Sequence, residues 1–146
     1  SFSKLYGLAG LRVGYGIGSA EMVDLLERAR HPFNVNSLAE VGACAALGDE
    51  EHVRRTLEMN AEGVDYLTRE LTGMGYEVFP TDTNFILVRM GEGFDQLLLK
   101  KGIIVRPMGG FGLTEHVRIS IGLPEENEKL VKALQEIRQA DGTESA

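Results

Sequence analysis

SFSKLYGLAGLRVGYGIG, residues 1–18, is the stretch of this sequence that decides the fold. It holds a lysine, Lys4, among hydroxyl-bearing serines and a run of glycines, and Arg12 follows eight residues later. Glycine has no Cβ atom, so a glycine-rich segment lets the backbone pass close to a bound small molecule. The stretch therefore predicts a binding site.

The residue types of this stretch suit one particular kind of ligand. A lysine becomes a covalent group when its neutral amine meets an aldehyde and forms a Schiff base. Pyridoxal phosphate supplies such an aldehyde, and it also carries a phosphate dianion that must be held. Ser1 and Ser3 offer hydroxyl donors, and Arg12 offers a planar, permanently charged guanidinium. Together with Lys4, they predict a site for an aldehyde that carries a phosphate.

A nucleotide-binding loop is the alternative for the same glycines. GYGIGSAE, residues 14–21, lies between a predicted strand and a predicted helix, as such a loop does. The G-x-G-x-x-G pattern fails at its last position, where Ser19 stands, and the sequence has no G-K-[ST] phosphate loop. We therefore favour the lysine-based site.

Composition and charge argue against several classes of partner. The 146 residues include 43% hydrophobic and 25% charged residues, which is ordinary for one globular domain. A formal net charge of −7 argues against nucleic acid and anionic membranes, which both attract clustered lysines and arginines. No apolar run approaches the roughly 18 residues of a membrane span. We expect no nucleic-acid partner and no membrane partner.

The cysteine and the histidines indicate neither a disulfide nor a metal site. Cys44 is the single cysteine and cannot form an internal disulfide, so we expect a reducing compartment, the cytoplasm. Its place in an alanine-rich stretch predicts a small buried side chain. His31, His52 and His116 are scattered without the spacing of metal ligands, so we expect no metal and assign them loop or helix-surface roles.

Apolar periodicity predicts a mainly helical first half. Ser19 is the predicted N-cap of one helix, which Pro32 ends, and Ser37 with Glu40 forms a capping box for the next. The predicted elements are a strand at 11–17 and helices at 20–30, 37–47 and 50–72. One apolar face of the long helix is formed by Val53, Leu57, Ala61, Val64, Leu67 and Leu71.

From about residue 76 the pattern changes to short strands and helices. The predicted strands are 76–80, 84–90, 103–108 and 116–122, and the predicted helices are 94–102 and 124–139. The second half therefore predicts a small α+β domain, in which a few strands have helices on one side, within an α/β protein.

At this point the sequence resembles a known family. SFSKLYGLAGLRVGYGIG is similar to the cofactor-lysine segment of fold-type I pyridoxal-phosphate aminotransferases. It is most similar to the histidinol-phosphate aminotransferase branch, which carries the signature S-K-x-Y-G-L-A-G-L-R-x-G-Y. GIIVRPMGGFG, residues 102–112, and EHVRISIG, residues 115–122, also match that branch. The resemblance extends to about residue 138.

The resemblance implies roles for the residues at the start of the chain. Lys4 would form the internal aldimine with pyridoxal phosphate and would then shuttle the proton between the substrate α-carbon and a cofactor carbon. Ser1, Ser3 and Arg12 would hold the cofactor phosphate. These roles agree with the chemistry that the residue types suggest.

The resemblance also implies three substrate-binding residues. Arg118 would hold the substrate α-carboxylate, Arg106 would reach the far end of the substrate, and Asn84 would lie near the cleft. The strand pattern agrees for Arg118, because alternation leaves Arg118 and Ser120 on one surface of an otherwise apolar strand. Both arginines stand in apolar stretches, where an unpaired guanidinium would be costly. A structural ion pair is the alternative for Arg118, and a strand-entry cap is the alternative for Asn84.

The resemblance implies that the chain is the C-terminal portion of a longer enzyme, in which a large domain precedes the lysine. Residues 1–36 would be the tail of the large cofactor-binding domain, residues 37–72 connecting helices, and residues 73–146 the small α+β domain. The full-length protein would be a cytoplasmic homodimer, and this fragment alone would be inactive.

The activity implied by the resemblance is amino transfer between two small molecules, an amino donor and a 2-oxo acid. Histidinol phosphate and 2-oxoglutarate would give imidazole acetol phosphate and glutamate in histidine biosynthesis. A threonine-phosphate decarboxylase or an aromatic aminotransferase of the same fold stays open, because both keep Lys4 and Arg12. From a different class, a non-catalytic α+β interaction module stays open as well.

Overall fold

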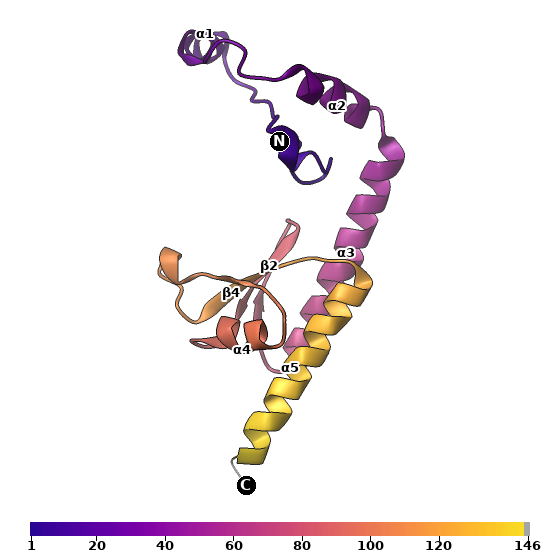
Figure 1. Cartoon of the computed structure of the whole chain (residues 1–146), viewed down its shortest axis with the longest axis vertical. Helices are drawn as coiled ribbons and strands as arrows, with labels where there is room; N and C mark the ends of the chain where they lie inside the picture. Colours follow the sequence, from indigo (N-terminus) through magenta and orange to yellow (C-terminus); the bar gives the residue numbers. More distant parts are fainter. Residues whose placement is uncertain (145–146) are drawn as a thin grey trace. The chain divides into compact units, whose positions relative to one another are not determined.

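The computed structural model describes the backbone of residues 1–144 and the side chains of residues 1–140. Contacts divide the chain into two compact units, Ser1–Leu57 and Glu58–Ala146. The boundary falls inside one helix, α3 (Glu50–Gly73), which runs through it (Figure 1). The division at residues 36 and 72 that the sequence suggests stays a prediction.

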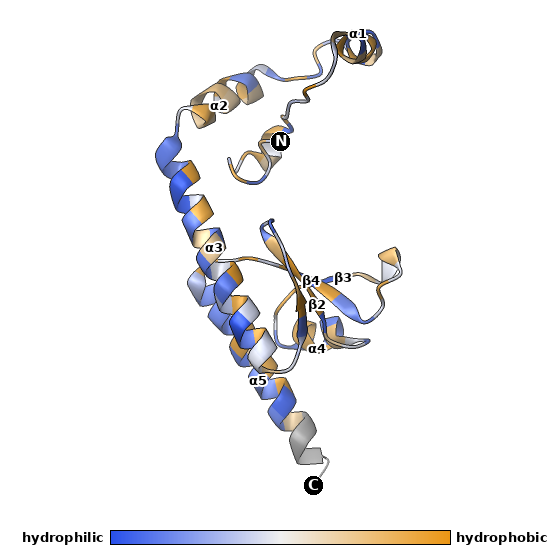
Figure 2. Cartoon of the chain, turned by 180° about the vertical axis from the view of Figure 1, so that it is seen from behind, coloured by the Kyte–Doolittle hydropathy of each residue, from blue (hydrophilic) through white to orange (hydrophobic). Residues whose placement is uncertain are grey.

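The first unit consists of one short 3-10 helix and α-helices. The elements are η1 (Ala9–Leu11), α1 (Ala20–Ala29), α2 (Ser37–Leu47) and the first part of α3. Ser19 caps α1 as predicted, because its hydroxyl accepts the N–H of Met22 at 3.3 Å. The ribbon of α1 is orange at its hydrophobic residues in Figure 2; their side chains are exposed, and none of the residues of α1 is buried.

The strand predicted at residues 11–17 is wrong. These residues hold the end of η1 and then chain that belongs to no helix or strand. A strand needs a ladder of backbone hydrogen bonds to a neighbouring strand. This segment is tied to the start of the chain by a bond between Phe2 N–H and Val13 O at 3.3 Å, which does not build a ladder.

The cap of α2 lies one residue earlier than predicted. Asn36 Oδ1 accepts the N–H of Ala39 at 2.9 Å, and Ser37 is the first helical residue. Asparagine and serine cap helices about equally well, so the sequence alone does not show which of Asn36 and Ser37 is the cap. The capping box of Ser37 and Glu40 is therefore a wrong prediction, although the bounds of the helix agree.

Cys44 is exposed, against the prediction of a buried side chain. The buried residues of α2 are Ala39 and Ala43, which are four apart and share a face. Cys44 is the next residue, and one step along a helix turns its side chain away from that face.

The bounds of α3 agree with the predicted helix at 50–72 to within one residue, but its buried face does not agree with the prediction. Asp49 Oδ1 accepts the N–H of His52 at 3.0 Å, and Gly75 follows the helix with a φ of +85°. Leu67 and Leu71 are fully buried, whereas Leu57 is 54% exposed. The predicted apolar face is thus buried only in its second half, where the sheet and another helix cover it.

The second unit is a four-stranded antiparallel sheet with helices on one face, which confirms the predicted α+β arrangement. The strand order is β1 (Glu77–Phe79), β2 (Phe85–Arg89), β4 (His116–Ser120) and β3 (Arg106–Pro107). β3 is shorter than the predicted strand at 103–108. Its second residue is a proline, which has no N–H to continue the ladder.

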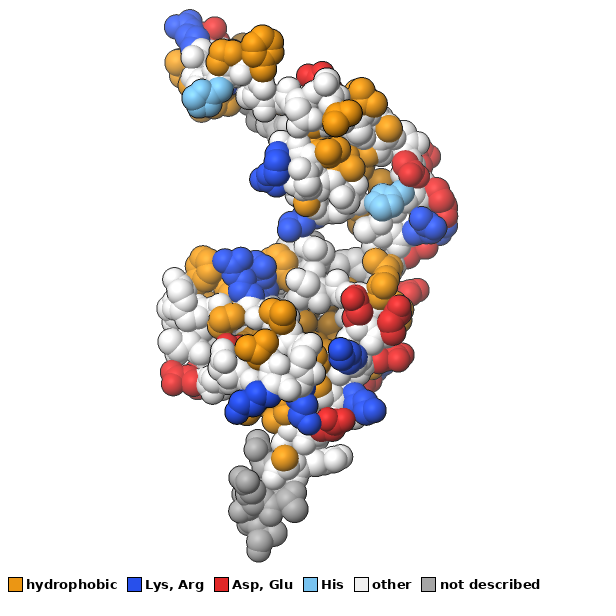
Figure 3. Space-filling model, viewed as in Figure 1, with side chains coloured by type: hydrophobic (Ala, Val, Ile, Leu, Met, Phe, Trp, Pro, Cys, Tyr) orange, Lys and Arg blue, Asp and Glu red, His pale blue; other side chains and the backbone are white. Residues whose placement is uncertain are grey.

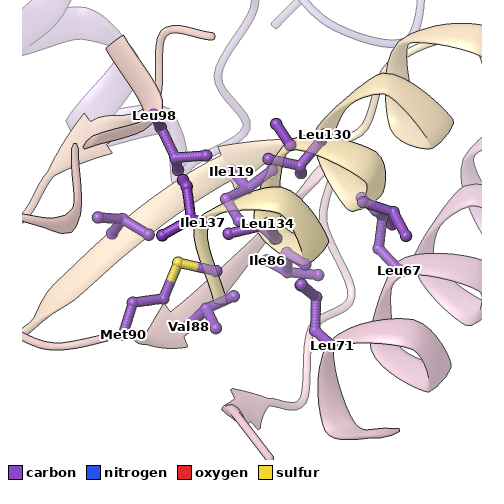
Figure 4. Close-up of a cluster of buried hydrophobic side chains, with 13 residues drawn as sticks. Leu67, Leu71, Ile86, Val88, Met90, Leu98, Ile119, Leu130, Leu134 and Ile137 are labelled. Atoms are coloured by element: carbon purple, nitrogen blue, oxygen red, sulfur yellow. The ribbon is translucent and has the colours of Figure 1, made fainter. Parts of the chain in front are cut away.

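The core lies between the sheet and three helices (Figure 4). Alternate residues of β2 and β4 point to this side, so Ile86, Val88 and Ile119 are buried. The helices are α3, α4 (Phe94–Lys100) and α5 (Pro124–Glu144). They contribute Leu67, Leu71, Leu98, Leu130, Leu134 and Ile137. The opposite face of the sheet carries the polar side chains of the same two strands.

The surface carries the acidic character that the net charge predicts. Acidic side chains, red in Figure 3, lie over α3 and α5. Within residues 1–144, no helix combines the length and the apolar character needed to cross a membrane.

Candidate active site

Residues 1–14 fold into one compact loop that returns to its own start. Leu8 N–H donates to Phe2 O at 2.9 Å, and Phe2 N–H donates to Val13 O at 3.3 Å. Gly14 lies against Ser1, since a Cβ atom on Gly14 would stand 3.4 Å from Ser1 Cα. The loop contains all four predicted cofactor residues: Ser1, Ser3, Lys4 and Arg12.

Phe2 anchors this loop, although it is not among the candidate residues predicted from the sequence. It is 5% exposed, and its ring lies 4.9 Å from that of Tyr6 and 5.9 Å from that of Tyr15, measured between centroids. Three aromatic residues in a glycine-rich stretch are the signal that could have revealed this cluster. The aromatic contacts and the backbone bonds together hold the loop.

Lys4 begins a tight turn and its side chain is exposed. Gly7 N–H donates to Lys4 O at 2.9 Å, and Gly7 has a φ of +69°. Glycine reaches this conformation without the steric cost of a side chain, which explains its place three residues after the lysine. The turn therefore presents the Lys4 amine at the surface of the unit.

Arg12 holds a backbone conformation that arginine rarely adopts. Its φ of 56° and ψ of 47° are left-handed, at the C-terminal end of η1. A non-glycine residue there costs about 1–2 kcal/mol. Such strain persists where the surrounding structure imposes it, and it gathers at ligand-binding sites. The guanidinium donates to Ala9 O at 2.9 Å and is exposed, so it can also meet a ligand.

The hydroxyls complete the set of donors in this loop. Ser1 Oγ accepts the N–H of Ser3 at 3.2 Å, and a hydroxyl that accepts keeps its own hydrogen to donate. An amine, two hydroxyls and a guanidinium fit a small molecule that carries an aldehyde and a phosphate.

In the second unit, Arg118 of β4 and Arg106 of β3 lie directly opposite each other on neighbouring strands. Their side chains leave the same face of the sheet, with Cβ atoms about 5 Å apart. Arg118 is also paired with Leu87 of β2, which pairs with Phe79 of β1. The four residues form one row across the sheet, on the face away from the core.

Arg118 is half-buried and stacked on an aromatic ring. Its guanidinium carbon lies 4.8 Å from the centroid of the Phe85 ring. Its Nε is buried and has no hydrogen-bond partner in the described part of the chain. An unsatisfied buried donor costs about 1–3 kcal/mol, so this position favours a ligand acceptor. Ile119 is buried and Ser120 exposed, which confirms that Arg118 and Ser120 share the outer face.

Arg106 is exposed, so the expectation of apolar surroundings is wrong for this residue. It lies on an edge strand of two residues, beside the 86% exposed Ile104. Its guanidinium carbon lies 5.8 Å from the centroid of the Phe111 ring, in η2 (Gly109–Phe111). The two arginines therefore stack on different rings.

Neither arginine forms an ion pair with a carboxylate of the described residues, so the structural ion pair weighed for Arg118 is not observed there. Glu115 and Glu77 instead pair with Arg89, at 2.6 and 3.9 Å. Like charges directly opposite each other on neighbouring strands repel. A bound anion would relieve this repulsion, so the pair has the character of an anion site.

Asn84 is exposed at the entry of β2. Its backbone oxygen accepts the N–H of Ile121 at 2.9 Å. The side-chain hydrogen bonds at this strand entry involve its neighbour: Thr83 Oγ1 donates to Phe85 O at 3.2 Å, and Asn60 Nδ2 donates to Thr83 O at 3.1 Å. The capping role considered for Asn84 is thus filled by Thr83.

The structure thus gathers the predicted residues into two groups. Ser1, Ser3, Lys4 and Arg12 share a loop of the first unit. Arg106, Arg118 and Asn84 lie in the sheet and the loops of the second unit.

Comparison with known proteins places the chain in a family. The chain matches the family "Aminotransferase class I and II" over residues 1–134. Histidinol-phosphate aminotransferase 2 of Ralstonia nicotianae is 52% identical over 141 residues, which cover 92% of this chain and 38% of that protein. The chain thus spans well under half the length of this relative.

Solved structures of similar fold support the same family. The histidinol-phosphate aminotransferase of Clostridium acetobutylicum is 29% identical with a TM-score of 0.89, covering 95% of this chain and 44% of that one. The histidinol-phosphate aminotransferase of Sinorhizobium meliloti, solved in complex with pyridoxal-5'-phosphate, is 28% identical with a TM-score of 0.85. That match covers 96% of this chain and 40% of that one. The fold is the fold-type I arrangement that the sequence resemblance implied, and the chain belongs to the aminotransferase class I and II family.

Proposed function

We propose that the whole protein carrying this chain is a pyridoxal-phosphate-dependent aminotransferase acting on histidinol phosphate and 2-oxoglutarate. The products are imidazole acetol phosphate and glutamate, in histidine biosynthesis. The identity of 52% to an enzyme named for this substrate supports the choice of amino donor. A cytoplasmic homodimer is part of the same proposal.

The loop of residues 1–14 is the observation that carries the proposal. It contains a lysine on a tight turn, two hydroxyls and an arginine held in a left-handed conformation. An ordinary surface loop gains nothing from a strained arginine, whereas a phosphate site gains a fixed guanidinium. The second unit adds two neighbouring arginines without an ion pair among the described carboxylates.

Each residue of the loop has a stated task in the proposal. Pyridoxal phosphate, when bound, supplies the electron sink for amino transfer. Lys4 holds the cofactor through Nζ and later accepts and returns a proton at the same atom. The Arg12 guanidinium and the hydroxyls of Ser1 and Ser3 hold the phosphate through charge-assisted hydrogen bonds.

The sheet of the second unit binds substrate in the proposal. The planar guanidinium of Arg118 suits a carboxylate, which amino acids and 2-oxo acids share. Arg106 binds the phosphate at the far end of histidinol phosphate. Their guanidiniums stack on Phe85 and Phe111 respectively, which supports their serving different groups of one substrate. Asn84, at the entry of β2, is the third residue proposed to line this region.

Glutamate formation from histidinol phosphate and 2-oxoglutarate tests the proposed function. We expect the whole protein with pyridoxal phosphate to form glutamate, Lys4→Ala to form none, and Lys100→Ala, a matched change of an exposed lysine, to behave as wild type. Release of carbon dioxide from threonine phosphate without amino transfer would instead identify a decarboxylase. A preference for phenylalanine would identify an aromatic aminotransferase. Absence of both cofactor binding and turnover would favour an interaction module.

A further inference from the structure

We propose that Asn36 and His52 are positioning residues that hold the backbone next to Arg12 and next to Lys4. Each side chain binds a backbone carbonyl of the 1–14 loop from a distant part of the sequence, 25 and 47 residues away. This inference rests on the proposed function, because it assigns the two residues to the service of a cofactor site.

Asn36 uses both ends of its side-chain amide. Oδ1 accepts the N–H of Ala39 at 2.9 Å and caps α2, while Nδ2 donates to Leu11 O at 3.2 Å. The Leu11 carbonyl belongs to the peptide group shared with Arg12. Rotation about the φ bond of Arg12 would swing this peptide group relative to the arginine, so the hydrogen bond restrains the left-handed conformation. Asn36 thereby links the start of α2 to the direction of the Arg12 side chain.

The packing of α2 supports this link. A Cβ atom on Gly42 would stand 2.9 Å from Leu11 Cδ1, so the α2 backbone lies directly against the Leu11 side chain. Leu11 is thus held twice, through its carbonyl by Asn36 and through its side chain by α2. Strain of the kind seen at Arg12 persists only where neighbours impose it, and these contacts help to impose it.

His52 holds a second point of the loop, next to Lys4. Its Nε2 lies 3.0 Å from Leu5 O, and Leu5 is a central residue of the turn from Lys4 to Gly7. Asp49 Oδ1 binds the backbone N–H of His52 at 3.0 Å and so fixes the first turn of α3 that carries it. Leu5 O can only accept, so Nε2 carries the hydrogen, which both the Nε2–H tautomer and the imidazolium provide.

The two anchors have separable consequences. Loss of the Asn36 donor loosens Arg12, so it weakens binding of the phosphate group but leaves the aldehyde chemistry of Lys4 in place. Loss of His52 loosens the turn that presents Lys4, so it slows capture of any aldehyde, with or without a phosphate. A general folding defect would instead affect every property together.

The experiment compares pyridoxal phosphate with pyridoxal, which lacks the phosphate, on variants of the whole protein. Asn36→Asp keeps an oxygen acceptor for the α2 cap and removes the donor to Leu11. We expect it to weaken pyridoxal phosphate binding about tenfold while pyridoxal binding changes less than about twofold. His52→Leu should slow covalent labelling by both aldehydes about tenfold, measured after borohydride reduction. His52→Gln, whose amide can donate from a similar position, should restore the rate.

Thermal unfolding and circular dichroism of each variant provide the folding control, and Arg12→Ala and Lys4→Ala report on the proposed function itself. If Arg12→Ala weakens phosphate binding and Lys4→Ala abolishes labelling, while Asn36→Asp and His52→Leu match wild type, the positioning roles are wrong and the function stands. If Asn36→Asp weakens both ligands equally, the substitution disturbs the whole loop rather than Arg12, and the separate role proposed for Asn36 is wrong. If His52→Gln behaves like His52→Leu, the hydrogen bond is not the cause. If Lys4→Ala is labelled like wild type, the proposed function fails, and the positioning roles fail with it.

Discussion

At the scale of single residues, Arg118 and Arg106 differ more than their similar sequence settings suggest. Arg118 is half-buried with an unsatisfied Nε, whereas Arg106 is exposed on an edge strand. Both leave the same face as direct cross-strand partners. A ligand that accepts a hydrogen bond from an unsatisfied buried donor removes the free-energy cost of that donor, whereas an exposed donor already binds water. We therefore expect their substitutions to have different effects.

Arg118→Ala should lower kcat/KM for glutamate and phenylalanine by about 10²-fold, because both carry the carboxylate that its guanidinium would bind. Histidinol phosphate lacks that carboxylate and should be less affected. Arg106→Ala should lower kcat/KM for histidinol phosphate by about the same factor and leave phenylalanine much less changed. Steady-state kinetics with the three donors measure this.

Arg89→Ala is the matched control on the same face. Arg89 pairs with Glu115 and Glu77, so its loss should affect all donors alike. An equal loss of all three donors in Arg106→Ala would mean that Arg106 is structural or serves the cofactor, and the phosphate-binding role would be abandoned.

The candidate site residues could be proposed from the sequence, whereas their surroundings could not. Lys4 and Arg12 lie in one contiguous motif, so their chemistry could be interpreted without knowing the fold. The pairing of Arg106 with Arg118 depends on strand register, which short strands do not reveal. The contacts of Asn36 and His52 join residues far apart in the chain, so no local pattern could predict them.

At the scale of elements, the helices were predictable and the ends of the strands were not. Periodicity over many residues predicted α3 and α5, because a long amphipathic pattern has few alternatives. The predicted strand at 11–17 failed because a strand depends on its neighbours rather than on its own residues. The buried residues of α3 likewise depend on what covers the helix, and they include Gly63, which no apolar pattern would select.

Gly63 allows α3 to pack against the chain that follows β4. A Cβ atom at this position would stand 2.4 Å from Ile121 Cγ2 and 3.1 Å from Asn127 Nδ2. Gly63→Ala should therefore lower the free energy of unfolding by about 1–2 kcal/mol, although alanine favours helices. Urea unfolding followed by circular dichroism measures the change.

Gly73→Ala is the control, because a Cβ atom there would meet nothing within 4 Å. It should leave stability unchanged or slightly raised. Equal stability of the two variants would show that the contact between Gly63 and Ile121 is not tight.

The ion pair between Lys101 and Glu136 joins the end of α4 to α5, at 2.9 Å. The hydrogen bond from Lys101, and then its charge, lowers the pKa of Glu136 below the ordinary glutamate value. Because the pKa of Glu136 is lower in the folded state than in the unfolded state, the ion pair stabilises the fold at pH values above the unfolded-state pKa. This contribution disappears as the pH falls through the folded-state pKa. Glu136→Gln should thus be less stable than wild type near pH 7, and the difference should vanish in acid.

Thermal unfolding at several pH values measures this difference. Glu92→Gln is the control, because Glu92 is exposed in a loop and its carboxylate forms no ion pair within the described residues. A pH-independent difference between Glu136→Gln and wild type would show that the charge of Glu136 is not the cause.

At the scale of the whole molecule, the chain holds a lysine, hydroxyls and arginines but spans 38% of the length of its Ralstonia relative. Each charge-assisted hydrogen bond to the cofactor contributes about 1.5–3 kcal/mol. We predict that the 146-residue chain alone shows no turnover and reacts with pyridoxal phosphate slowly and weakly. Measurable amino transfer by the isolated chain would contradict this, and an absorbance titration with the cofactor measures the affinity.

The measurement that tests the central claim most directly is the mapping of the lysine that pyridoxal phosphate labels. The whole protein is incubated with pyridoxal phosphate, reduced with borohydride, digested and analysed by mass spectrometry. The label should lie on Lys4, the lysine that the 1–14 loop presents at its surface. A label on Lys100 or Lys101 in place of Lys4 would contradict the assignment of Lys4, and with it the account of this chain as the cofactor-lysine part of an aminotransferase.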